Sequence, residues 1–215
     1  MREGLWMASE TARTPDSPED LAAAWLTAVD TPAVVAELEA IYAMAAQEIG
    51  RRGPACWASG RCCNFRETGH LLYVTGLEAA YCVRRLAGAG RGRLSSGAVE
   101  AARAAGGCPF QNGNLCGVHA IKPLGCRVYF CDRAAQGWQH DLTERGLGML
   151  RELHERYGIA YRYGEWRGML GMFAEAGADG LAEGGGPEAD PAVAVRLPML
   201  PGADNRPRPG AADAR

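Results

Sequence analysis

Lysine is nearly absent from this chain: Lys122 is the only one, and every other basic residue is arginine. Lysine and arginine together (23) nearly balance aspartate and glutamate (25), giving a formal net charge of -2. This balance predicts no nucleic-acid partner, because a nucleic-acid surface needs an excess of basic charge. The chain also lacks an apolar run of the roughly 20 residues that a membrane span requires, since residues 21–29 are followed by Asp30. We therefore expect no membrane association.

An export signal is also missing. The first ten residues carry acidic side chains and have no continuous apolar core, so we expect a cytoplasmic protein whose thiols stay reduced. The sequence holds no G-x-S-x-G motif, no H-E-x-x-H motif and no phosphate-binding glycine loop after a suitable strand. No nucleophile–base pair stands out, so the sequence leaves open whether the protein is an enzyme.

Cysteine is the residue type that is concentrated here. The chain has 8 cysteines, and all but Cys82 fall in two clusters. The clustered cysteines are Cys56, Cys62, Cys63, Cys108, Cys116, Cys126 and Cys131. Thiolates at short range bind soft metal ions and iron–sulfur clusters, so the sequence predicts a metal centre. Cys82 shares one helical stripe with Ala79 and Val83, and we predict a core residue there.

The spacing of these cysteines differs from that of ordinary zinc knuckles. The intervals contain five, seven, nine and four residues, with one adjacent pair, and only Cys126-x4-Cys131 comes near the usual C-x2-4-C pattern. Irregular spacing with a Cys-Pro step at Cys108 favours cluster ligation. The C-x3-C-x2-C pattern of radical-SAM proteins is absent.

Several of these motifs together resemble the YkgJ family, a zinc- or iron-chelating family with a CxxCxxCC signature. The motifs are Cys62-Cys63, Cys108-Pro-Phe, Cys116-x-Val-His119 and Lys122-Pro-x-x-Cys126-Arg127-x-Tyr129. The resemblance covers residues 56–131. His119 stands where the family commonly has tyrosine, and Lys122 stands where arginine is common. The resemblance implies a bound metal, with an iron–sulfur cluster favoured over zinc.

These observations predict a metal-binding protein with a cysteine-ligated iron–sulfur cluster, [4Fe–4S] in the leading form, that serves an unidentified protein or redox partner. A structural zinc protein, or one that chelates and passes on iron or zinc, is the alternative. The candidate ligands are the seven clustered cysteines and His119, which lies among them. Arg127 is a candidate for hydrogen bonding to the cofactor, because it is adjacent to Cys126. We expect His154 to be a satisfied core histidine, since it shares a helix face with leucines.

The local signals predict a mainly α-helical fold. Ser17 and Thr31, each followed by proline, start two helices or one kinked helix that ends at Gly50. Thr75 and Glu78 form a capping box that opens a helix to about residue 86. Further helices are expected over 96–105 and 142–157, the latter being the last, and extended segments over 71–74 and 159–163.

The expected domain spans residues 17–176. It is a small irregular helical domain, with little strand, wrapped around the cysteine-ligated centre. Residues 1–16 and 177–215 are polar or rich in glycine, proline and alanine without apolar periodicity, and we expect disorder in both. Because the first helices are rich in alanine, we also expect a modest hydrophobic core that depends on the metal for its order.

Overall fold

Helices hold most of the residues that the computed structural model describes, which are 17–54, 56, 58–88, 94–130, 132 and 135–175. The mainly α fold class is therefore confirmed. The helices are α1 (Pro18–Ala28), α2 (Pro32–Arg52), α3 (Phe65–Thr68), α4 (Gly76–Gly88), α5 (Ser96–Ala105), α6 (Leu124–Val128), α7 (Gln136–Arg156) and α8 (Trp166–Glu175), with a 3-10 turn η1 (Arg61–Cys63). The strands are β1 (Tyr73–Thr75), β2 (Gln111–Asn112), β3 (Leu115–Cys116) and β4 (Tyr163–Glu165). Residues 1–16 and 177–215, where disorder is expected, lie outside the described residues.

The first two helices begin where the sequence predicts. The Ser17 hydroxyl accepts a hydrogen bond from the Asp20 backbone N–H at 3.0 Å and so caps α1. The predicted stop at Gly50 is wrong: α2 continues to Arg52 and ends at Gly53, whose φ of +57° suits glycine. Among the described residues no single helix is long and apolar enough to cross a membrane, although α1 and α2, bent by 87°, pass that test when combined.

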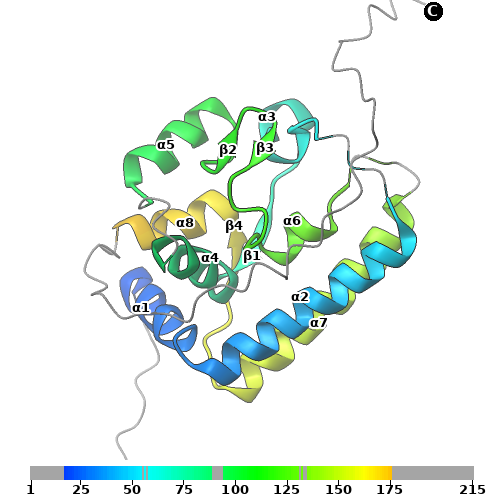
Figure 1. Ribbon diagram of the computed structural model, residues 1–215. Helices are drawn as coiled ribbons and strands as arrows, with labels where there is room; N and C mark the ends of the chain where they lie inside the picture. Colours follow the sequence, from blue (N-terminus) through cyan, green and yellow to red (C-terminus); the bar gives the residue numbers. More distant parts are fainter. Residues whose placement is uncertain are drawn as a thin grey trace, which may run out of the picture.

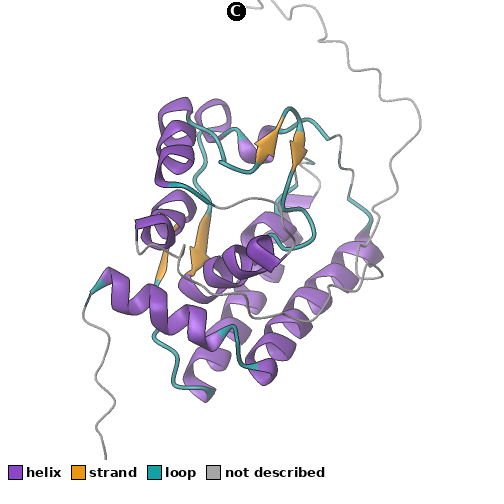
Figure 2. Ribbon diagram, turned by 60° about the vertical axis from the view of Figure 1, so that its left-hand side comes forward, coloured by secondary structure: helices purple, strands orange, loops and turns teal. Residues whose placement is uncertain are grey.

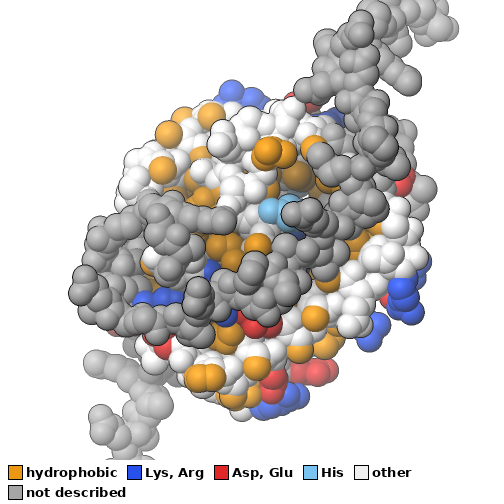
Figure 3. All heavy atoms as spheres, in the orientation of Figure 1, with side chains coloured by type: hydrophobic (Ala, Val, Ile, Leu, Met, Phe, Trp, Pro, Cys, Tyr) orange, Lys and Arg blue, Asp and Glu red, His pale blue; other side chains and the backbone are white. Residues whose placement is uncertain are grey.

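Helices α2 and α7 form an antiparallel pair along one side of the molecule (Figure 1). Arg156 at the end of α7 pairs with Glu37 near the start of α2 at 2.7 Å. At the other end of the pair, the Arg52 guanidinium lies 5.2 Å from the centre of the Trp138 ring. Acidic and basic side chains are visible over these two helices at the lower right of Figure 3. The short helix α6 packs against both α2 and α7.

Helix α4 packs against α1 and α8, which also contact one another, and it adjoins strand β1 of a small ribbon. The strands are drawn in orange in Figure 2. Strand β1 pairs antiparallel with β4, with Val74 opposite Gly164. The backbone N–H of Trp166 donates to the Leu72 carbonyl at 2.8 Å, so the start of α8 is fixed to β1. The ribbon therefore joins segments about ninety residues apart in the chain and places Trp166 beside the second cysteine loop.

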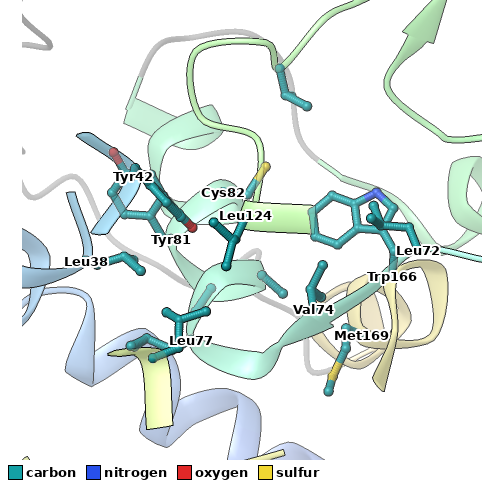
Figure 4. Close-up of a cluster of buried hydrophobic side chains, with 14 of the residues drawn as sticks. Leu38, Tyr42, Leu72, Val74, Leu77, Tyr81, Cys82, Leu124, Trp166 and Met169 are labelled. Atoms are coloured by element: carbon teal, nitrogen blue, oxygen red, sulfur yellow. The ribbon is translucent and has the colours of Figure 1, made fainter. Parts of the chain in front are cut away.

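The hydrophobic core is larger than the alanine content predicts. Trp25, Trp166 and Phe173 are almost completely buried, each at 1% exposure or less. Buried leucines from α2, α4, α6, α7 and α8 join them, and Figure 4 shows one part of this core around Leu124. The expectation of a modest core is wrong because the large side chains come from α7 and α8 as well as from the N-terminal helices.

Two elements differ from the sequence prediction near the C-terminal end of the described chain. Helix α7 starts at Gln136, six residues earlier than expected, because its first turns are polar and give no apolar periodicity. Helix α8 was not predicted, and α7 is therefore not the last helix. The buried residues Trp166, Met169, Leu170 and Phe173 do have helical spacing. Gly168 and Gly171 between them lower the helix propensity and obscure that signal.

Candidate metal centre

A short backbone contact brings the two cysteine loops together. Asn64 and Gly107 form an isolated antiparallel bridge. In antiparallel pairing, the residue before one partner faces the residue after the other, so Cys63 lies opposite Cys108. The Arg66 backbone N–H donates to the Gly106 carbonyl at 2.9 Å and strengthens the contact. The first loop is thereby docked at the C-terminal end of α5.

A hairpin in the second loop brings in Cys116. Strands β2 and β3 pair with Gln111 opposite Cys116, and the turn between them contains Gly113 with φ of +56°. The Gln111 side chain reaches the Gly60 carbonyl at 3.4 Å. A Cβ atom at Gly60 would lie 2.9 Å from Gln111 Nε2 and 3.0 Å from the backbone of Asn114. Glycine at position 60 therefore permits the hairpin to lie against the first loop.

Four sulfur atoms meet at this junction. The Cys62 and Cys63 sulfurs are 4.0 Å apart. Hydrogen bonding with the sulfurs of Cys108, then Cys116, then Cys62 raises the pKa of the Cys63 thiol far above its ordinary value. The same hydrogen bonds lower the pKa of Cys62 to about 6, that of Cys116 to about 7 and that of Cys108. Close thiols that share a proton behave in this way. We call Cys62, Cys63, Cys108 and Cys116, together with Cys126, the sulfur group.

Cys126 joins the sulfur group from α6. Burial of its thiol, followed by the negative charges of Cys108 and Cys116, raises its pKa well above the ordinary value, and the positive charge of Lys122 opposes the shift. Lys122 also lowers the pKa of Cys62 and of Cys116. Lys122 was not predicted as a site residue, and only its place between Cys116 and Cys126 in the chain indicated that it lies near them.

Cys82 is a core residue, as predicted, with 0% exposure. Burial raises its pKa, and the charges of Cys108 and Cys116 act in the same direction. In Figure 4 its side chain lies next to Leu124. Cys56 is exposed. Cys131 lies outside the described residues, and its role stays a prediction.

The side-chain contacts of His119 and Arg127 within the described residues are with Lys122, the Tyr42 ring and the Ala120 carbonyl. His119 is at the surface, with its Nε2 atom 3.2 Å from the Lys122 ammonium. Desolvation, followed by the charges of Lys122 and Arg127, lowers the pKa of His119 to about 4. The Arg127 guanidinium lies 4.1 Å from the centre of the Tyr42 ring and donates to the Ala120 carbonyl at 2.8 Å. Their proposed roles at the metal centre stay predictions.

The imidazole of His70 lies beside the first cysteine loop, a position that the sequence indicated only weakly. It stacks on the Tyr129 ring at 4.5 Å between centroids, and its Nδ1 lies 2.6 Å from the Thr68 hydroxyl. Burial lowers the pKa of His70, and a hydrogen bond with the Cys62 backbone opposes this shift. His154 is buried as predicted, with Nδ1 3.2 Å from the Ile159 carbonyl. Its Nε2 atom has no hydrogen-bond partner among the described residues, so the histidine is only half satisfied.

The buried indole N–H of Trp166 faces the same group. Within the described residues it makes no hydrogen bond of normal geometry. Its interaction with the Cys108 sulfur nevertheless contributes to the lowered pKa of that thiol. A buried donor without an oxygen or nitrogen acceptor suits a site that holds thiolate or metal-bound sulfur. The residues therefore fit a sulfur-ligated centre in their chemistry.

The cysteines of the sulfur group are arranged as interacting thiols. Across the described ranges, no set of three or more histidine, cysteine, aspartate or glutamate side chains has the geometry to hold a metal ion. Comparisons of the chain with protein-family models, with curated proteins and with solved structures found no match. Any functional conclusion therefore rests on the residues of this chain.

Proposed function

We propose that this protein binds a cysteine-ligated metal centre, in the first place an iron–sulfur cluster of the [4Fe–4S] type. Cys63, Cys108, Cys116 and Cys126 are the proposed ligands. Thiolates are the residues that such clusters require. The bound cluster would supply one-electron chemistry, and its use in electron transfer, redox sensing or a modification reaction stays open.

One observation carries this proposal: sulfurs from three separate segments gather at one point. The Cys63 thiol interacts with Cys62, Cys108 and Cys116, and the charges on Cys108 and Cys116 reach Cys126. Of the four proposed ligands, Cys108 and Cys116 have a lowered pKa, which favours the thiolate form that binds metal, whereas the pKa of Cys63 and of Cys126 is raised in the metal-free thiols. The unsatisfied indole N–H of Trp166 supports the proposal, because hydrogen bonds to cluster sulfur tune such centres.

A structural or transferable zinc ion is the second candidate, and one distance favours it. Two thiolates bound to the same tetrahedral zinc at about 2.3 Å lie about 3.8 Å from one another. The Cys62 and Cys63 sulfurs, 4.0 Å apart, come close to this separation. Adjacent residues rarely place both side chains on one ion, however, and we therefore rank zinc below the cluster.

We also propose membership of the YkgJ family and a cytoplasmic location. The support for the family is the order of the cysteines over residues 56–131 and the proline, histidine, arginine and tyrosine residues that flank them. The location is inferred from the need of the sulfur group for reduced thiols. A redox or substrate protein is the proposed partner.

Purification without oxygen, followed by analysis of metal and acid-labile sulfide, tests the proposal. We expect brown protein with iron and sulfide in near-equal amounts. A Cys63→Ser, Cys116→Ser double variant should be colourless and is the matched control. Stoichiometric zinc without sulfide would reject the cluster and retain the metal site. Reduced protein that holds neither metal after reconstitution would reject both candidates.

A further inference from the structure

Glu78 is a buried carboxylate surrounded by hydrogen-bond donors. It is 1% exposed. Oxygen Oε2 accepts from the backbone N–H and from the hydroxyl of Thr75, each at 3.0 Å, which completes the predicted capping box of α4. Oxygen Oε1 accepts from the Leu124 backbone N–H at 2.7 Å and from the Tyr42 hydroxyl at 3.4 Å. The sequence did not predict these last two contacts, which reach α6 and α2.

The contact with Leu124 holds the start of α6. Pro123 precedes this helix and supplies no capping side chain. A five-residue helix has little stability of its own, so its position depends on what anchors it. The Leu124 side chain is 1% exposed and lies in the core region of Figure 4. Gly146 of α7 makes room for it, because a Cβ there would lie 2.5 Å from Leu124 Cδ2. Cys126 is only two residues further along the chain.

A second chain of contacts leads from Glu78 to the same helix. The Tyr42 hydroxyl bonded to Glu78 belongs to the ring on which the Arg127 guanidinium lies. Arg127 follows Cys126 directly, and its other contact is with the Ala120 carbonyl in the loop after Cys116. The carboxylate therefore contacts the segment between Cys116 and Cys126 directly at Leu124, and it is linked to Ala120 of the same segment through Tyr42 and Arg127.

We propose that Glu78 is the positioning residue of the sulfur group, and that its carboxylate anchors α6 so that Cys126 lies beside Cys108 and Cys116. This inference rests on the proposed metal function, although the anchoring itself also applies to metal-free protein. Glutamate is required because the Leu124 and Thr75 backbone groups on its two sides are donors. Glutamine has one acceptor oxygen, so its amide N–H2 would face a donor on one side.

Alkylation of the thiols in reduced, metal-free protein tests the anchoring. Peptide mapping by mass spectrometry gives the alkylation rate of Cys126 relative to Cys63, which is buried in the other loop. In Glu78→Gln we expect this ratio to rise at least about tenfold, because a buried donor left without an acceptor loosens α6 locally. The control is Leu26→Ala in α1, which removes a buried side chain away from α6. General destabilisation should leave the ratio within about twofold of wild type.

The same variants are then tested for metal. Glu78→Gln should retain less iron than Leu26→Ala after identical anaerobic purification. An unchanged Cys126 to Cys63 ratio in Glu78→Gln would overturn the inference. If Glu78→Gln does not fold, Glu78→Asp is used instead. The aspartate side chain is one methylene shorter, so its carboxylate does not reach the Leu124 backbone N–H. We expect the same rise in the Cys126 to Cys63 alkylation ratio. If the wild-type protein binds no metal but Glu78→Gln still raises the Cys126 to Cys63 alkylation ratio, the anchoring role is upheld and the proposed metal function is rejected.

Discussion

Among the described cysteines, the surroundings of each sulfur decide its role. Cys82 is enclosed by the core, where burial keeps it protonated, and it has no sulfur as a hydrogen-bond partner. Cys63 is also buried, but three other sulfurs surround it. The difference lies in the backbone, because the Asn64–Gly107 bridge faces Cys63 towards the second loop. Burial alone therefore does not separate a structural cysteine from a ligand.

Single substitutions to alanine test this distinction. The protein should lose at least about tenfold in metal affinity with each single replacement of a proposed ligand, because one metal–sulfur bond is removed. The replaced ligands are Cys63, Cys108, Cys116 and Cys126. Cys82→Ala should keep the metal and cost about 1 kcal/mol of stability through lost burial. Metal content per folded protein is the measurement, with circular dichroism as the check on folding. Retention of metal by Cys126→Ala together with its loss from Cys82→Ala would contradict the assignment.

At the level of elements, local signals predicted the caps and failed where tertiary contacts set the boundary. The Ser17 cap, the Thr75–Glu78 capping box and the bounds of α5 follow from side chains within a few residues of each other. The start of α7 and the existence of α8 depend on burial against distant segments, which periodicity alone did not indicate. The β2–β3 hairpin was also missed, although Asn112-Gly113 is a recognised turn signal.

The sequence indicated which cysteines come close together better than it indicated the other residues around them. Their grouping is visible in the spacing because each loop carries several of them. Trp166, His70 and Glu78 reach the site from other elements, through the β1–β4 ribbon, ring stacking and a buried carboxylate. Contacts of this kind join residues far apart in the chain and leave no local pattern.

Gly60 provides a test of the contact between the loops. Gly60→Ala should destabilise the protein by about 1–3 kcal/mol, since alanine is strained at φ of +73° and its Cβ would press on Asn114. The matched control is Gly53→Ala, which has φ of +57° but open space around the added carbon. It should cost about 1 kcal/mol through strain alone. Urea unfolding measures both variants, and only Gly60→Ala should also lose metal. Equal effects on metal content would show that the close approach at Gly60 does not hold the site together.

For the whole molecule, the sulfur group lies at the edge of the core, where Cys108, Cys116 and Cys126 pack against it. Buried residues from α1, α2, α4, α6, α7 and α8 form a continuous core. The sulfur group lies where the first loop, the β2–β3 hairpin and α6 meet at one side of that core. The fold therefore has a source of stability that does not depend on a metal.

Removal of the metal should accordingly leave a folded protein. We expect the apo form to keep its helical circular dichroism and a single thermal transition at a lower Tm, because a ligand that binds only the native state adds stability. Amide exchange should increase in residues 58–68 and 107–128 more than in α2 or α7. Thermal scans of holo and chelator-treated protein under reducing, oxygen-free conditions provide the comparison. A gradual apo transition would show instead that the metal holds the whole domain together.

The contact between α1 and α8 has a consequence for how the protein is made. Trp25 of α1 meets Phe173 of α8 at 6.2 Å between ring centroids, and its indole donates to the Ala160 carbonyl at 2.7 Å. During synthesis the N-terminal part of the chain leaves the ribosome first. The apolar faces of α1 and α4 that pack against α8 therefore stay exposed until α8 has emerged. Both cysteine loops have left the ribosome by then. The thiols are therefore open to a metal donor, and equally to an oxidant, before the last helix completes the core.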